Sequence, residues 1–178
     1  IFLAMELCAA GSTVSMMRRR GGTLPIVEAG AILLDALAGL GYMHAQGYVH
    51  RDVKPENIIL TGEGGTAKVS DFGLAKSFEE AGFSGLTTNG TSMGTPNFMA
   101  PEQFTNYRFV DPVTDIWAAG ATFYHLITGH FPRDLPAGTG SVEALLNSRI
   151  VPILERDRSV PRKLAATIMR ALGEEIDE

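Results

Sequence analysis

Cysteine is almost absent from this chain of 178 residues, because Cys8 is the only one. A single cysteine excludes an internal disulfide and favours a reducing, cytoplasmic compartment. Positive charge is also scarce: 15 lysines and arginines face 20 acidic residues, and the formal net charge is −5. This balance argues against a general nucleic-acid or anionic-membrane binder. The run from Arg18 to Arg20 does not change that expectation, since arginines beside Gly21 and Gly22 are typical of a solvated helix end.

One segment, 116–131, is apolar enough to test as a membrane span. It falls short of the roughly 20 apolar residues that a span needs, and it contains His125 and His130. A helix that is apolar nearly all round is more often buried in a core. We therefore expect a core helix here and no membrane segment within this chain. The chain begins at Ile1, without a methionine or a signal-peptide pattern, which is a first indication of a fragment.

Hydrophobic residues make up 45% of the chain, enough for the packed core of one ordinary domain or of part of a larger one. The longest periodic stretch, 25–46, has Leu33, Leu37, Leu40 and His44 at helical spacing. The letters "TGEGGT" between two β-prone pieces predict a hairpin. We expect a mainly helical fold with short β-hairpins: a strand over 1–7, a short helix ending in the arginine run, a helix over 25–46, strands over 57–60 and 67–70, a loop over 78–94, and helices over 116–131, 142–148 and 161–172.

Four short motifs follow one another along the chain. "HRDVKPEN" places Asp52 five residues before Asn57, and "DFG" begins at Asp71. "GTPNFMAPE" covers 94–102, and "DIWAAG" opens the apolar segment at Asp115. Each motif alone is weak, because a lone DFG is most often a turn and a lone HRD is often a surface ion pair. The four together, in this order, resemble the protein kinase superfamily.

The resemblance implies the C-terminal lobe of the two-lobed α+β protein kinase fold. It covers essentially all of 1–178, as a partial catalytic domain with hinge and C-lobe. The Gly-rich phosphate loop, the strand lysine and the helix glutamate of the family would lie upstream of Ile1, so we expect this fragment alone to be inactive. Lys54, two residues after Asp52, is typical of serine/threonine kinases, and "APEQF" looks most like the eukaryotic-type kinases of bacteria.

The same resemblance assigns chemistry to four residues, with ATP and Mg²⁺ as cofactors. In phosphoryl transfer the protein supplies position and charge stabilisation. Asp52 would accept the proton of the attacking hydroxyl, and Lys54 would offset developing negative charge. Asn57 and Asp71 would provide the hard oxygen ligands that magnesium prefers. Protein substrates with Ser or Thr acceptors are the implied partners.

The N-terminal edge is similar to the fifth strand and hinge of a kinase. Met5 would stand at the gatekeeper position, and the backbone of Glu6 and Cys8 would face adenine. Ile59 would form the floor beneath the base. Without the resemblance, Cys8 reads as a small buried hydrophobe.

Regulation is implied by an arginine beside the catalytic aspartate. In similar kinases Arg51 contacts a phosphate on the activation loop, with Lys76 as a second basic contact and Thr95 touching Asp52 and Lys54. A phosphate adds about −1.5 to −2 charge and would order the loop. Alternatively, Arg51 simply pairs with a nearby carboxylate or carbonyl. The candidate acceptors are Ser84, Thr87, Thr88, Thr91 and Ser92, and we expect autophosphorylation within 87–92, at Thr91 first.

A second function class remains open. A pseudokinase or scaffold would keep the fold and bind partners without catalysis. Asp52, Lys54, Asn57 and Asp71 are all present, and a scaffold has no physical need for all four. This favours an ATP-dependent serine/threonine kinase.

Overall fold

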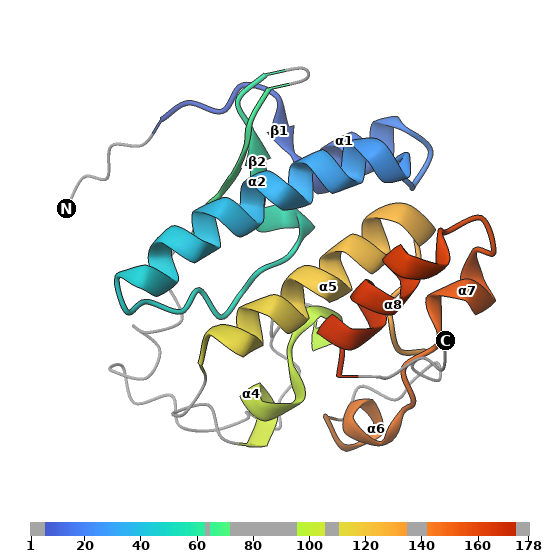
Figure 1. The fold of residues 1–178 in the computed structure, drawn as a ribbon. Coiled ribbons are helices and arrows are strands. Elements are labelled where there is room, and N and C mark those ends of the chain that lie inside the picture. Colours follow the sequence, from blue (N-terminus) through green and yellow to red (C-terminus); the bar gives the residue numbers. More distant parts are fainter. Residues whose placement is uncertain (1–5, 63–64, 72–95, 106–110, 135–141, 174–178) are drawn as a thin grey trace.

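The computed structural model describes residues 6–62, 65–71, 96–105, 111–134 and 142–173. These ranges form a mainly helical body with one small sheet at its edge (Figure 1). Helix α5 (Pro112–Thr128) lies between α2 (Ile26–Ala45) and α8 (Arg162–Ala171) in the body, and the sheet packs on α2 through its third strand. The mainly helical prediction with a short hairpin is confirmed for this part of the chain.

The sheet has three antiparallel strands in the order β1-β2-β3. Strands β2 (Ile58–Leu60) and β3 (Ala67–Val69) form the predicted hairpin, with Ile58 opposite Val69. Strand β1 (Gly11–Ser12) pairs with the other edge of β2. The strand predicted over 1–7 is not found at Glu6 and Leu7, which have no strand pairing, and residues 1–5 lie outside the described ranges. Leu7 is 86% exposed, so its side chain is not packed as in a strand of a sheet.

Helix α1 (Thr13–Arg19) ends at the arginine run as predicted, and α2 (Ile26–Ala45) matches the helix predicted over 25–46. Pro25 stands immediately before α2, and Gly47, with φ of 79°, follows its end. The buried side chains of α2 are Ala29, Ile32, Ala36 and Leu40. Its opposite face is exposed although it is also apolar.

Helix α2 is, within the described ranges, the one helix long and apolar enough to cross a membrane by length and composition. Core helices of soluble proteins pass the same test. In this structure the helix packs against both β3 and α5. Its Asp35 carboxylate also accepts a hydrogen bond from the Ala67 backbone N–H at 2.9 Å. These contacts are those of a core helix.

Helix α5 (Pro112–Thr128) is the predicted core helix and begins four residues before the expected start at 116. Asp111 caps it, because its carboxylate accepts a hydrogen bond from the Val113 N–H at 2.8 Å. Close packing on α8 (Arg162–Ala171) requires Gly120, since a Cβ there would lie 3.0 Å from the Cβ of Ala171. The helix predicted over 161–172 is thereby found as α8, and that predicted over 142–148 is found as α6 (Val142–Asn147).

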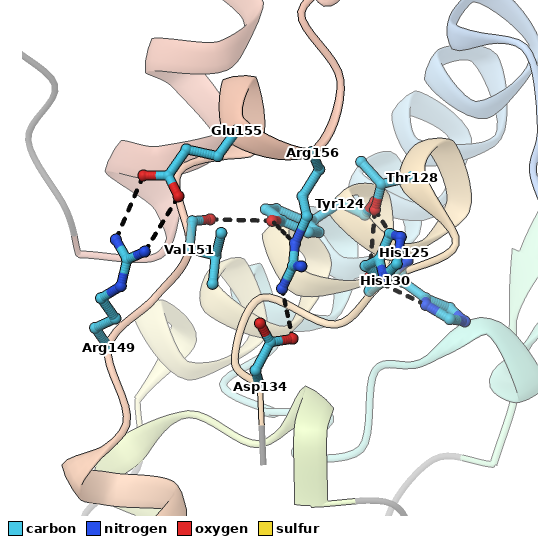
Figure 2. Close-up of polar contacts among 9 residues, drawn as sticks. All are labelled: Tyr124, His125, Thr128, His130, Asp134, Arg149, Val151, Glu155 and Arg156. Carbon is cyan, nitrogen blue, oxygen red and sulfur yellow. Dashed lines mark hydrogen bonds and ion pairs between the residues drawn. The ribbon is translucent and has the colours of Figure 1, made fainter. Parts of the chain in front are cut away.

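Short elements complete the body: η1 (Pro55–Asn57), η2 (Pro96–Phe98), α4 (Pro101–Thr105) and α7 (Ile153–Arg156). A polar network fixes α7 to α5 (Figure 2). The hydroxyl of buried Tyr124 donates to the Val151 carbonyl at 3.0 Å and accepts from Arg156 Nε at 3.3 Å. Arg156 also binds Asp134, at 2.5 Å. Burial is the main reason that the pKa of Tyr124 is raised above 10.0.

Candidate active site

The loop between α2 and β2 carries the "HRDVKPEN" residues, and a buried carboxylate on α5 holds its backbone. Asp115 is fully buried. Its Oδ2 accepts hydrogen bonds from the His50 N–H at 2.8 Å and from His44 Nε2 at 2.7 Å. Its Oδ1 accepts a bond from the Arg51 N–H at 2.8 Å. Asp115 therefore ties the start of the loop to the core.

His50 connects this loop to the end of the hairpin. The Asp52 N–H donates to His50 Nδ1 at 3.2 Å, so Nδ1 is an acceptor. His50 Nε2 consequently carries the hydrogen that it donates to the Ser70 carbonyl at 2.8 Å. This side chain is 1% exposed, so its two bonds act within the core.

Asp52, Lys54 and Asn57 form a compact polar group. Lys54 Nζ donates to both carboxylate oxygens of Asp52, at 2.9 and 2.7 Å. Asn57 Nδ2 donates to the Asp52 carbonyl at 2.7 Å and to its Oδ2 at 2.9 Å. The Asp52 side chain is nevertheless 44% exposed, against 17% for Lys54. An incoming hydroxyl can therefore reach a carboxylate whose orientation is fixed by two neighbours.

The hairpin brings Asp71 to the same end as Asn57. Because β2 and β3 are antiparallel with Ile58 opposite Val69, the residue before β2 lies beside the residues that follow β3. The Ser70 N–H and hydroxyl both donate to the Asn57 carbonyl, at 2.8 and 3.2 Å. Asp71 comes next and is exposed.

Two backbone positions in this site are strained. Among the described non-glycine residues, Arg51 and Asp71 are those with positive φ, at 70° and 63°. Such left-handed conformations cost free energy and persist where the surroundings over-determine them. For Arg51 those surroundings include Asp115 on its N–H and Gln103, whose Nε2 donates to the Arg51 carbonyl at 2.7 Å.

The donor types suit a magnesium ion with phosphate ligands better than an all-protein metal cage. No three His, Cys, Asp or Glu side chains cluster within the described ranges. Both side-chain hydrogen bonds of Asn57 use Nδ2, so they leave its Oδ1 unengaged. This amide oxygen and the exposed Asp71 carboxylate are hard oxygen donors at one end of the hairpin. Magnesium is commonly bound through one or two protein oxygens together with substrate phosphates and water.

Only some of the residues predicted to contact the nucleotide or to regulate the site lie within the described ranges. Ile59 lies in β2 and is partly exposed, opposite Ser12 on one side and Lys68 on the other. The side chain of Glu6 pairs with Lys68, and this hydrogen bond raises the Lys68 pKa. Cys8 is a free, partly exposed cysteine. Met5, Lys76, Thr87, Thr88, Thr91 and Thr95, together with Ser84 and Ser92, lie outside the described residues.

Sequence reasoning missed the supports of the site. It gave no role to Asp115, His44, Ser70 or Gln103, which hold the loop from α5, α2, the end of the hairpin and α4. Gln103 is 5% exposed and also accepts a bond from the Ala100 N–H at 3.0 Å. A signal existed for Asp115: it is an acidic residue inside an otherwise apolar helix, and such a residue needs a buried partner.

Comparison with known proteins assigns the family of this mainly helical body with its small sheet and its Asp52–Lys54–Asn57 group. The model of the protein kinase domain family matches residues 1–172. This chain belongs to the protein kinase family.

Named relatives support the serine/threonine branch. The chain is 38% identical over 131 residues to serine/threonine-protein kinase PknL of Mycobacterium tuberculosis, covering 74% of this chain and 31% of that protein. It is 39% identical over 132 residues to serine/threonine-protein kinase hippo of Drosophila melanogaster, covering 74% and 19%. Human serine/threonine-protein kinase STK11 is 35% identical over 138 residues, covering 74% and 30%. The chain thus spans less than a third of the length of these relatives.

A solved structure supports the fold. The crystal structure of Rad53 1-466 in complex with AMP-PNP superimposes with a TM-score of 0.72. It covers 94% of this chain and 40% of that one, at 23% identity. The likeness shows a kinase fold.

Proposed function

We propose that this chain is the hinge and C-terminal lobe of a serine/threonine protein kinase catalytic domain. The full-length protein would transfer the γ-phosphoryl group of Mg-ATP to Ser or Thr hydroxyls of protein substrates. The observation that carries the proposal is the exposed Asp52 carboxylate, oriented by Lys54 and Asn57. Asp71, at the adjacent end of the hairpin, completes the set.

In this proposal each side chain has one task. Asp52 accepts the proton of the substrate hydroxyl. The hydroxyl oxygen bonds to the γ-phosphorus while the bond between that phosphorus and the β-phosphate oxygen breaks, which leaves ADP. Lys54 lies against Asp52 and supplies positive charge near the transferred group. Asn57 and Asp71 would hold magnesium, which when bound offsets the negative charge of the phosphates. The deep anchoring of the loop by Asp115 keeps these groups in position.

The test compares full-length wild type with Asp52→Asn. The variant keeps size and shape but loses the base, so kcat should fall roughly 100- to 10,000-fold. Nucleotide affinity, measured with a fluorescent ATP analogue, should be unchanged. Asp134→Asn is the matched control, because Asp134 is an exposed aspartate away from the loop, and it should turn over normally. Equal rates for wild type and Asp52→Asn would contradict the assignment.

Two further outcomes separate the alternatives. Asp71→Asn should weaken the magnesium dependence of nucleotide binding, a readout independent of turnover. A wild-type protein that binds nucleotide but never transfers phosphate to any Ser or Thr peptide would be a pseudokinase.

Control by loop phosphorylation is part of the proposal. Arg51 stands at the edge of the described site, with its backbone held by Asp115 and Gln103. We infer that a phosphate within 87–92, at Thr91 first, uses Arg51 and Lys76 as cationic partners. Mass spectrometry of active protein should find this phosphate. Full activity after Thr87, Thr88, Thr91 and Ser92 are all changed to Ala would rule out the switch.

A further inference from the structure

A buried threonine at the start of α1 holds the far end of the candidate catalytic loop. Thr13, the first residue of α1, is fully buried. Its Oγ1 donates a hydrogen bond of 2.7 Å to the carbonyl oxygen of Pro55, 42 residues further along the chain. Pro55 is also buried and opens the η1 turn that carries Asn57. The phosphoryl-transfer proposal gives Thr13 no task.

The stability of α1 does not by itself account for this hydroxyl. Polar side chains at the start of a helix commonly bond to groups of their own first turn, and Ser12 shares a hydrogen bond of 3.2 Å with the hydroxyl of Ser15. A hydroxyl has one O–H to donate, and Thr13 uses it on a carbonyl of a different element. A valine would fill nearly the same space without that O–H. The hydroxyl therefore serves the contact between α1 and η1.

The η1 turn transmits this attachment to Asn57. The Asn57 N–H donates to the Lys54 carbonyl at 3.0 Å, and Asn57 Nδ2 donates to the carbonyl and the carboxylate of Asp52. Pro55 stands inside this turn, between Lys54 and Asn57. A shift of the Pro55 carbonyl would therefore move the Asn57 amide relative to Asp52 and to Asp71. The orientation of Asn57 Oδ1 depends on that turn.

The loop is thus attached to the body at two points on either side of Asp52 and Lys54. Before them, Asp115 on α5 accepts a hydrogen bond from the Arg51 N–H at 2.8 Å. After them, Thr13 on α1 donates to Pro55. The first point fixes the backbone that leads into Asp52, and the second fixes the backbone that leads into Asn57.

The second attachment comes from the side of the chain that is predicted to face the nucleotide. Strand β1 ends at Ser12, directly before Thr13, and Ser12 pairs with Ile59 on β2. Both β1 and α1 pack against η1. Thr13 therefore lies where the segment that follows the predicted hinge meets the turn before β2.

We propose that Thr13 is a positioning residue for Asn57 as a magnesium ligand. Because Thr13 is fully buried, it acts through the Pro55 carbonyl and not on the nucleotide itself. The inference rests on the proposed function, which takes Asn57 as a ligand of magnesium. Residues that orient a metal ligand typically change metal affinity about 10- to 100-fold. Thr13 acts through the backbone, one step further from the metal, so the lower end of this range is expected.

The experiment measures magnesium-dependent nucleotide binding by the full-length protein, without turnover. The probe is a fluorescent, non-hydrolysable ATP analogue, titrated at a series of magnesium concentrations. Thr13→Val keeps the shape and removes the O–H, so half-maximal binding should require about tenfold more magnesium than in wild type. Thr13→Ser keeps the O–H and should retain the wild-type requirement. One hydrogen bond is small against the stability of a domain, so both variants should fold.

Thr122→Val is the matched control. Thr122 is as fully buried as Thr13, and among the described residues its Oγ1 has no hydrogen-bond partner. The control makes the same chemical change on α5 and should leave the magnesium requirement unchanged. Urea denaturation of each variant shows how much stability it loses. A purely structural role for Thr13 would lower stability without changing the magnesium requirement.

Three results would each overturn the role of Thr13: a wild-type magnesium requirement in Thr13→Val, an equal shift in Thr122→Val, or a shift in Thr13→Ser as large as that in Thr13→Val. The proposed function fails by a different result, which is full turnover in Asp52→Asn. An inactive Asp52→Asn together with a wild-type magnesium requirement in Thr13→Val would therefore reject the positioning role and keep the proposed function.

Discussion

Replacement of Asp115 by alanine is expected to be the most damaging single change at the candidate site. The carboxylate is fully buried and accepts three hydrogen bonds, from the backbone of His50 and Arg51 and from the His44 ring. Hydrogen bonds to a charged group contribute about 1.5–3 kcal/mol each. Their simple sum overestimates the effect, because bonds to one carboxylate are not additive and water can reach part of the loop.

A loss of about 3–5 kcal/mol is therefore expected for Asp115→Ala, the usual cost of removing one partner from a buried charged group. This is a large fraction of the roughly 5–15 kcal/mol that holds a domain folded. Asp115→Asn should cost less, about 1–3 kcal/mol, since its oxygen can still serve His50 and His44. Its amide NH₂ would then face the Arg51 N–H, donor against donor.

Urea denaturation followed by circular dichroism measures these losses. Asp111→Ala is the control on the same helix, because it removes an exposed N-cap bond to Val113 and should cost about 1 kcal/mol. If Asp115→Ala costs no more than Asp111→Ala, the loop is not anchored through α5 and the reasoning is wrong. Loss of phosphotransfer in Asp115→Asn with nearly full stability would instead show that the anchor acts mainly on loop geometry.

Three further predictions concern the rest of the body. Burial lowers the pKa of His125 below 6.5, so the unfolded state binds the proton first and stability should fall as pH drops below about 6.5. His125→Phe should flatten this dependence, measured by urea denaturation at several pH values. Tyr124→Phe leaves the Val151 carbonyl without its donor and should cost about 1–3 kcal/mol in urea denaturation. Leu34→Lys, on the exposed face of α2, should cost under about 0.5 kcal/mol, whereas Ile32→Lys on its buried face should prevent folding.

The hairpin and the long helices could be predicted because their signals are local. A Gly-rich turn between β-prone pieces specifies β2 and β3, and an apolar run of sufficient length specifies α5. At Glu6 and Leu7, the described part of the strand expected over 1–7, the prediction was wrong for the opposite reason. A strand is stabilised by its neighbour, and the pairing with β2 begins only at Gly11.

The orientation of α2 shows another limit of sequence patterns. Of the leucines at helical spacing, Leu40 is buried but Leu33 and Leu37 are only partly buried. The helix is apolar on every side, so its sequence contains no amphipathic direction. The face that turns inward is selected by β3 and α5, which meet α2 only in the folded chain.

The candidate site likewise combines residues that are close in sequence with supporting residues that are distant in sequence. Asp52, Lys54 and Asn57 lie within six residues, in one motif, and the resemblance of that motif to protein kinases grouped them in the prediction. The residues that support them lie far along the chain. Asp115, for example, accepts a hydrogen bond from the backbone of His50, which lies 65 residues before it. No local pattern encodes such a contact.

The distant contacts also explain why the backbone is strained within the candidate site. Arg51 and Asp71 hold left-handed backbone conformations that neither residue prefers. Arg51 keeps its conformation between two distant partners, Asp115 on its N–H and Gln103 on its carbonyl. These buried polar contacts stabilise a left-handed conformation at the start of the loop that the local sequence disfavours. Asp52, the next residue, can then present a partly exposed carboxylate from a fixed backbone, as the proposed proton transfer requires.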